Sequence, residues 1–247
     1  MSAMSLERSP VAVPIVAGTA IRGLAASLMM NGVLQRHPNA FLVTLEQWGI
    51  SVRLDESQRH LSTAIRAGLL RQNRDPDQPI VLVGHSQGGL AVLRYAVDHP
   101  EQVLRVITVG TPWNGARLAG TVNSVVHTLL RRHVPALVDM TPSSGFLRAL
   151  HEDVPAIADR VTNIYSTREI LIEPYASAHI GVPGVTNVLI ATPGEYEQHL
   201  RVYGHTHPVD ELIEGKVNHL GEMSSPDVRG VIWRRVGEAS QEMRERG

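Results

Sequence analysis

The stretch VLVGHSQGG, at residues 81–89, organises the rest of this 247-residue chain. Residues 80–83 are apolar and mostly β-branched, which is typical of a buried parallel strand. Apolar residues then recur at helical spacing from Leu90 to the stop at His99-Pro100. A serine at such a strand-to-helix turn stands clear of the backbone, where a base and a substrate carbonyl can both reach it. The stretch therefore predicts that Ser86 is a nucleophile.

The same turn accounts for the glycines on either side of the serine. The strand and the helix approach each other so closely, two positions before and two after the serine, that only glycine fits. Gly84 and Gly88 occupy these positions, and His85 and Gln87 complete the pentapeptide. Because G-x-S-x-G is common by chance, the prediction depends on the strand and the helix around it.

Expected strands and expected helices alternate along the rest of the chain. Further strands are expected at residues 11–17, 41–45, 103–109, 161–165 and 185–190. Further helices are expected at residues 21–35, 54–69 and 228–236. Ser225-Pro226-Asp227 suits the start of the last helix, with a serine cap, a proline at the first position and an acid near the positive helix end. The alternation predicts an α/β fold, with a mostly parallel sheet and helices on both faces, in a single domain over residues 1–247.

Residues 113–160 do not follow this alternation. They contain many apolar residues but no convincing strand, so we expect a helical insertion there. The insertion could simply cover one end of the sheet. It could also act as a cap or lid with an apolar acyl pocket, since insertions at the carboxyl ends of strands lie over the active site.

Composition narrows the range of partners. The charge is nearly balanced, with 23 basic and 24 acidic residues, so neither nucleic acid nor an anionic membrane surface is expected as a partner. No apolar stretch approaches the ~20 residues that span a bilayer. The chain has no cysteine, which excludes disulfides and thiolate metal sites. We expect a cytoplasmic protein, although lack of cysteine is also compatible with secretion.

The N-terminus offers an alternative interpretation. Arg8, followed by the mostly apolar residues 11–20, imitates the charged and apolar regions of a signal peptide. Pro10 and Pro14 interrupt the run, and the same residues are needed as the first strand. A strand is therefore the preferred interpretation.

Two motifs in this order carry a resemblance to a known family. GHSQGG at residues 84–89, followed after the expected strand at 103–109 by GTPWNG at residues 110–115, resembles bacterial lipases and esterases of the α/β-hydrolase fold. Those enzymes often have a G-H-S-x-G-G turn and then a G-T-P-x-x-G stretch. The resemblance extends over residues 11–233 and is weak in the insertion. It implies a Ser–acid–His triad in that chain order, with an oxyanion hole of backbone N–H groups.

The base of the implied triad should come late in the chain, from His199, His205, His207 or His219. We prefer His219, because VNHLG at residues 217–221 precedes the last expected helix and resembles the H-L-G/A stretch of the family. His205 and His207 could instead be read as a metal pair. Without cysteine nearby and with few acids, that alternative is disfavoured.

The acid should follow the strand at 161–165, where Glu169 and Glu173 compete. The family commonly has a D-x-x-V-x-P pattern, and EILIEP at residues 169–174 matches its register with Glu169 first. A glutamate departs from the more usual aspartate, and its extra methylene would require the loop to sit back slightly. Glu173 would then be a solvated loop charge.

The oxyanion donors depend on position rather than on side chain. The N–H of Gln87, directly after the nucleophile at the start of a helix, is expected to be one donor. The other should come from the loop after the first strand, where Thr19 is the candidate. The family usually has H-G-x there, whereas this chain has Ala17-Gly18-Thr19.

Together these residues predict a carboxylic ester hydrolase, a lipase or carboxylesterase, that acts through Ser86, Glu169 and His219 on a small ester with an apolar acyl chain. The expected reaction requires no organic cofactor and no metal. An acyltransferase or thioesterase with the same triad is the alternative, and a non-catalytic binding protein of the same fold is disfavoured because all three triad positions can be filled.

Overall fold

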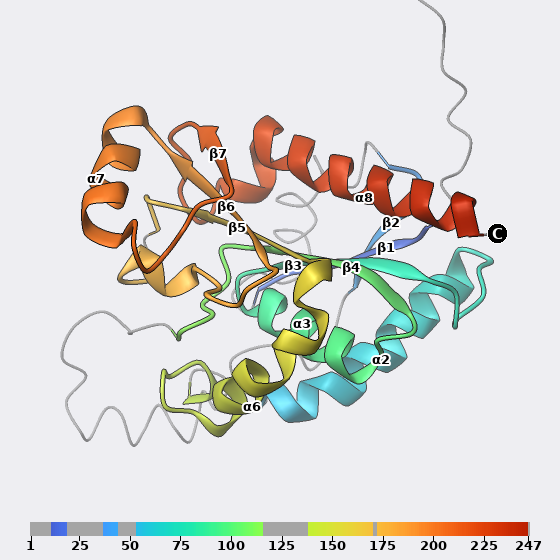
Figure 1. Ribbon diagram of the computed structural model, residues 1–247. Helices are drawn as coiled ribbons and strands as arrows, with labels where there is room; N and C mark the ends of the chain where they lie inside the picture. Colours follow the sequence, from blue (N-terminus) through green and yellow to red (C-terminus); the bar gives the residue numbers. More distant parts are fainter. Residues whose placement is uncertain (1–10, 19–36, 44–52, 116–137, 170–171, 247) are drawn as a thin grey trace, which may run out of the picture.

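The computed structural model describes residues 11–18, 37–43, 53–115, 138–169 and 172–246 (Figure 1). Its strands are β1 (Val13–Val16), β2 (Ala40–Val43), β3 (Ile80–His85), β4 (Val103–Val109), β5 (Val161–Ser166), β6 (Thr186–Ala191) and β7 (Glu211–Glu214). Its α-helices are α2 (Leu54–Arg71), α3 (Gln87–Asp98), α6 (Gly145–Asp153), α7 (Pro193–Tyr203) and α8 (Pro226–Arg246). Three short 3-10 helices complete the described elements: η1 (Val154–Arg160), η2 (Tyr175–Ala178) and η3 (Glu222–Ser224).

The described strands form one parallel sheet. Their order is β2-β1-β3-β4-β5-β6-β7, and every pair of neighbours runs parallel. The pairing sets Gly84 of β3 opposite Thr108 of β4, and His85 opposite Val109. Because the strands are parallel, their carboxyl ends share one edge of the sheet, and Ser86 lies at that edge. The prediction of a mostly parallel sheet is confirmed.

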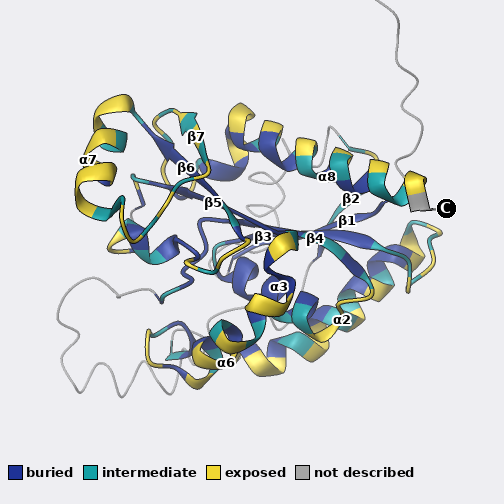
Figure 2. Ribbon diagram, viewed as in Figure 1, coloured by how far each residue is buried: buried dark blue, intermediate teal, exposed yellow. Residues whose placement is uncertain are grey.

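Helices cover both faces of the sheet. In Figure 1 the sheet lies between α8 on one side and α2, α3 and α6 on the other. Alternate residues of β3 serve the two layers: Leu82 joins the core under α2 and α3, whereas Val81 and Val83 join the core under α8. Figure 2 shows the resulting buried band along the strands and on the inner sides of these helices. Burial on both faces explains why residues 80–83 of β3 are all apolar.

The last helix begins where the sequence predicts. The hydroxyl of Ser225 accepts a hydrogen bond from the N–H of Val228 at 3.5 Å, and its carbonyl accepts one from Arg229 at 3.1 Å. The helix continues to Arg246, well past the expected end at residue 236. Its second half is mostly polar, so few apolar residues mark it, and Arg235 pairs with Glu238 there. Within the described chain, no helix has the length and apolar character needed to cross a membrane.

Two elements were not predicted. The edge strand β7 is short, and its sequence ELIE places a glutamate at each end of the strand, so no apolar run marks it. In α7, His199 is the one buried residue, which leaves no apolar stripe at helical spacing. Its start does carry a local signal: Thr192 and Glu195 form a capping box, with Pro193 at the first position.

Several expectations fall outside the described residues. The helix expected at 21–35 lies there, as do the end of the second strand and residues 116–137 of the expected cap. The part of the cap from residue 138 onwards contains α6 and η1, both packed near α3. The helical character expected for the insertion therefore holds for this part. Its function as a cap or lid stays a prediction.

We expect Gly88→Ala to destabilise the protein. A Cβ atom at residue 88 would lie 2.3 Å from the carbonyl oxygen of Val16, which belongs to the backbone of β1 and cannot move aside. The free energy of unfolding, measured with urea, should fall by about 1–3 kcal/mol or more. Gly237→Ala is the matched control, because Gly237 is exposed in α8 with no atom within 4 Å of the added Cβ, and it should gain up to about 1 kcal/mol. An unchanged Gly88→Ala variant would contradict this packing.

Candidate active site

Ser86 has a strained backbone conformation at the turn between β3 and α3. Its φ of 55° and ψ of −128° lie in a region that residues with a Cβ rarely adopt. The N–H of Ser86 donates to the carbonyl of Val109 at 2.8 Å, which fixes the turn to the end of β4. The serine is half-buried between the end of β3 and the start of α3. The sequence prediction of a strand–serine–helix unit is confirmed.

The loop after β1 passes directly against the serine. A Cβ atom at Gly18 would lie 2.7 Å from Cβ and 3.2 Å from Oγ of Ser86. Thr19, the candidate oxyanion donor, is the next residue and lies outside the described part of the chain. Gln87 is the first residue of α3, and the first N–H groups of a helix have no partner within it. Its N–H therefore lies at the start of the helix, next to Ser86, and its role as an oxyanion donor stays a prediction.

Glu169 and His219 form a buried pair. Oε2 of Glu169 lies 2.8 Å from Nδ1 of His219, and both side chains are almost fully buried. They come from two loops that the backbone ties together, since Arg168 and Asn218 form a parallel β-bridge. The hydroxyl of Ser166 adds a hydrogen bond to the carbonyl of Val217. The residues just before the acid and the base are thus held side by side.

Gly110 closes the site from the side of β4. Its φ of 54° is in the left-handed region, and a Cβ atom there would lie 2.9 Å from Nδ1 of His219 and 3.1 Å from Oε1 of Glu169. Only a glycine backbone can therefore pass so close to the pair. This is the first residue of the GTPWNG stretch, whose position the sequence identified without this reason for its glycine.

His85 connects the serine turn to the base. Its Nε2 lies 3.0 Å from the carbonyl oxygen of His219, and the two imidazole centroids are 4.8 Å apart. Among the described contacts, no hydrogen bond joins Ser86 to His219. Hydrogen bonds of this kind are often long before substrate binds. The structure thus places both residues at one edge of the sheet, and their direct contact belongs to the proposed function below.

A second buried carboxyl, from Glu222, lies at the same place and was not predicted. Its side chain is fully buried at the start of η3, with Oε2 3.8 Å from Nδ1 of His219. Burial, followed by the negative charge of Glu169 and a hydrogen bond with it, raises the pKa of Glu222 well above its usual value. The signal available in the sequence was that Glu222 is an acid three residues after the candidate base His219. Glu222 faces His219 because the chain makes a tight helical turn, η3, at this point.

The other candidates lie elsewhere. Glu173 is exposed, so of the two competing acids the structure brings only Glu169 to His219. His199 is the buried residue of α7, where the hydroxyl of Tyr175 and the carbonyl of His207 contact its two ring nitrogens at 3.0 Å. His205 is exposed.

One group of side chains in the described chain has the spacing of a metal site. It consists of His85, His219 and Glu222, whose nearest atoms all lie within 4.8 Å of one another. Nε2 of His85 already faces the carbonyl of His219, and Nδ1 of His219 faces Glu169. Both contacts use ring nitrogens that a metal ion would need as ligands.

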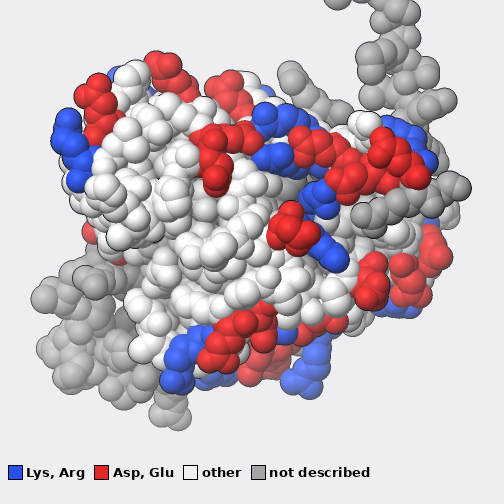
Figure 3. Space-filling model, in the orientation of Figure 1, with Lys and Arg blue, Asp and Glu red and all other residues white. Residues whose placement is uncertain are grey.

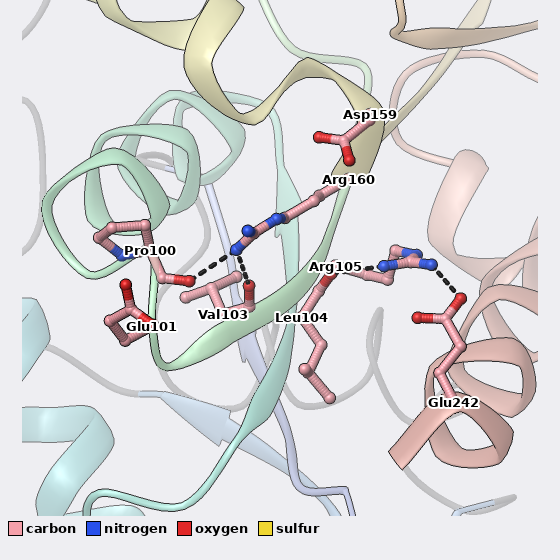
Figure 4. Close-up of a pocket in the computed structure, with 8 residues that line it drawn as sticks. All are labelled: Pro100, Glu101, Val103, Leu104, Arg105, Asp159, Arg160 and Glu242. Atoms are coloured by element: carbon pink, nitrogen blue, oxygen red, sulfur yellow. Dashed lines mark hydrogen bonds and ion pairs between the residues drawn. The ribbon is translucent and has the colours of Figure 1, made fainter. Parts of the chain in front are cut away.

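Away from the serine, a polar cleft of about 370 Å³ lies at the opposite end of β4 (Figure 4). Its arginines have partners: Arg105 pairs with Glu242 of α8, and Arg160 donates to the carbonyls of Pro100 and Val103. A second cleft of about 450 Å³ lies where α2, α3 and α6 meet. Neither contains a residue of the candidate active site, and both are lined by residues that tie the elements together.

Comparisons with known proteins agree with this arrangement. Residues 66–132, which include β3, the serine turn and β4, match a family model described as alpha/beta hydrolase fold. No curated protein matches the chain in sequence.

Solved structures extend the likeness beyond the matched segment. Aspergillus fumigatus lipase B has a TM-score of 0.57 and 19% identity, and the likeness covers 74% of this chain. This chain therefore spans about half of the lipase, since 45% of the lipase chain is covered. The mature form of Bacillus licheniformis lipase BlEst2 has a TM-score of 0.55 and 15% identity, with 92% of each chain covered. Paleococcus ferrophilus monoacylglycerol lipase has a TM-score of 0.53 and 14% identity, with 93% of each chain covered.

The sheet, the serine turn and these likenesses together define the class of protein: the chain has the α/β-hydrolase fold. Its structural neighbours include lipases and esterases at low sequence identity.

We expect His85→Gln to make the free energy of unfolding depend less steeply on pH below 6.5. Burial, and then the neighbouring His219, lowers the pKa of His85 from 6.5 to about 3. As the pH falls from 6.5 towards 3, the unfolded chain binds a proton that folded His85 does not, so stability falls with decreasing pH. The contribution is up to about 1.4 kcal/mol per pH unit.

Urea unfolding at a series of pH values measures this slope. The wild-type curve should be steeper than that of His85→Gln, whose amide can still donate to the carbonyl of His219. His60→Gln, at an exposed position of α2, should keep the wild-type slope. Equal slopes for wild type and His85→Gln would contradict a buried, neutral His85.

Proposed function

We propose that this protein is a serine hydrolase of carboxylic esters, with Ser86 as nucleophile, His219 as general base and Glu169 as the acid that orients it. The observation that carries the proposal is the buried contact of 2.8 Å between Glu169 and Nδ1 of His219, at the same sheet edge as a strained serine. A buried acid–imidazole pair beside a strained serine is the arrangement that activates a hydroxyl.

The first half of the proposed reaction acylates the serine. Nε2 of His219 takes the proton of the Ser86 hydroxyl as Oγ attacks the ester carbonyl carbon, and the carbonyl electron pair moves onto its oxygen. When the tetrahedral intermediate collapses, the bond to the alcohol oxygen breaks and His219 gives its proton to the leaving alcohol. Ser86 is left as an ester of the substrate's acyl group.

The second half repeats these steps with water. His219 takes a proton from water, the hydroxide attacks the acyl carbon, and the proton returns to Oγ of Ser86 as the carboxylic acid leaves. The negative charge of Glu169 next to Nδ1 stabilises the imidazolium that forms in each half. This sequence consumes only ester and water, so the proposal requires neither a metal nor an organic cofactor.

The proposed oxyanion hole lies between α3 and the loop after β1. The N–H of Gln87 is at the positive end of α3, which favours a developing negative charge. Gly18 brings the loop backbone against Ser86, so the N–H of the following Thr19 is our candidate for the second donor. The backbone of Ala17-Gly18-Thr19 would then occupy the position of the family's usual H-G-x sequence, without the histidine side chain.

We propose an uncharged ester with an apolar acyl chain as substrate. Three of the structural neighbours are named lipases, one of them a monoacylglycerol lipase. On the face seen in Figure 3, charged residues of both signs lie together along the upper and lower edges and in one group near the middle, and a broad area to the left of that group is uncharged. This distribution offers no attraction to a polyanion on that face and agrees with a neutral substrate.

We expect Ser86→Ala to lose hydrolysis of p-nitrophenyl esters by about a thousandfold or more, because no other hydroxyl occupies the turn. A panel of esters from acetyl to palmitoyl measures the loss and the preferred chain length. A fluorophosphonate should add its mass to the wild-type protein and not to Ser86→Ala. If the wild-type protein gains no adduct, the serine-hydrolase proposal is wrong, and a non-catalytic binding protein of this fold becomes the preferred interpretation.

Added alcohols and thioester substrates extend this measurement. If wild type forms transesterification products faster than free acid, or prefers thioesters, the acceptor in the second half is not water. The triad would then serve acyl transfer or thioester cleavage.

We expect Glu169→Gln to lower kcat by about 100-fold or more, because the imidazolium would lose its buried counter-charge. Glu173→Gln is the matched control from the same loop, and it should keep wild-type kcat because Glu173 is exposed. Steady-state kinetics on one p-nitrophenyl ester compares the two variants. An impaired Glu173→Gln together with an active Glu169→Gln would reverse the assignment of the acid.

A further inference from the structure

The buried charges around His219 do not balance if both acids are ionised. Glu169 and Glu222 are fully buried, and the titratable groups that face them in the described chain are His219 and His85. Nδ1 of His219, 2.8 Å from Oε2 of Glu169, is the nearest donor to the pair, and the four carboxyl oxygens have no other hydrogen-bond donor among the described contacts. Two buried carboxylates in contact, with one imidazole N–H between them, would be strongly unfavourable.

His85 does not resolve this imbalance. Its pKa of about 3 leaves the imidazole neutral, so it carries one ring proton. Nε2 faces the carbonyl oxygen of His219 at 3.0 Å, and because a carbonyl only accepts, that proton lies on Nε2 and is used there. The distance from Nε2 to Oε2 of Glu222 is 3.7 Å, too long for a second hydrogen bond. Glu222 therefore receives neither a positive charge nor a donor from His85.

We propose that Glu222 is a positioning residue that keeps its own proton and donates it to Glu169, so that the two carboxyls carry a single negative charge directed at Nδ1 of His219. This inference rests on the proposed function, since it assigns a role behind the proposed base. The raised pKa of Glu222 agrees with it. One proton between the carboxyls gives Glu222 a partner and gives Glu169 a second donor beside Nδ1 of His219.

The neutral form of Glu222 preserves His219 as a base. A second negative charge 3.8 Å from Nδ1 would favour the imidazolium before the substrate arrives, and an imidazolium cannot take the proton of Ser86. A neutral donor has a different effect, because it fixes the Glu169 carboxylate with one oxygen towards Nδ1. Glu222 thus acts through Glu169 and does not touch the reacting atoms.

Two variants of Glu222 with side chains of similar size distinguish the loss of a hydrogen-bond donor to Glu169 from the loss of packing. Glu222→Gln keeps a donor and has no charge, so kcat should stay within about threefold of wild type. Glu222→Met fills the space without a donor, and its kcat should fall about 10- to 100-fold with little change in KM. If the two variants are equally active or equally impaired, the positioning role is wrong. Circular dichroism and urea unfolding verify that both variants are folded.

The pH dependence of kcat/KM gives a sharper readout. If Glu222 is neutral in wild type, Glu222→Gln removes no charge and the acid limb should not move. If Glu222 were ionised, the substitution would remove a negative charge near Nδ1, and the acid limb would move to lower pH by about one unit or more. A shift of that size would overturn the proposal.

A third measurement does not depend on activity. At neutral pH, the infrared difference spectrum of wild type minus Glu222→Gln should contain the carbonyl stretch of a protonated carboxylic acid, shifted in heavy water. Absence of this band would overturn the proton assignment. If the wild-type protein shows the band but is not labelled by a fluorophosphonate, the proposed function fails while the shared proton stands.

Discussion

The close approach of α3 to β1 and β3 is the constraint on which the candidate site depends. Added Cβ atoms would lie 2.6 Å from the carbonyl oxygen of Gly88 if placed at Gly84, and 2.3 Å from that of Val16 if placed at Gly88. The chain between the two glycines therefore has no room for a relaxed turn, and Ser86 takes the strain with a φ of 55°. Strain at this one residue is what lifts its hydroxyl out of the sheet edge.

The remaining parts of the site are positioned by backbone contacts of the same kind. The Arg168–Asn218 bridge joins the loops that carry the acid and the base, although about fifty residues separate them in sequence. Gly110 then allows the end of β4 to pass next to both side chains. The parallel sheet makes this possible, since every strand delivers its following loop to one edge.

How far the sequence predicted this arrangement depends on the range of each interaction. The serine turn was predictable because its requirements lie close together in the sequence, within residues 80–98: an apolar strand, two glycines and a helix with apolar residues at helical spacing. The chain order of the fold named Glu169 and His219 as candidates, but only the structure brings them together. Glu222 carried only a weak signal, its place three residues after His219, because its burial follows from the turn of η3. The strand β7 carried none, because an edge strand needs no apolar run.

The charge distribution of the site also suits the proposed reaction. With Glu222 and His85 neutral, the resting site carries one negative charge, on Glu169. When the proton moves from Ser86 to His219 and the oxyanion forms, the total is still one negative charge, because an imidazolium and an oxyanion appear together. Burial penalises net charge far more than it penalises closely paired opposite charges. The net charge of the buried site therefore does not change in this step, and the two neutral neighbours of His219 keep that charge at one rather than two.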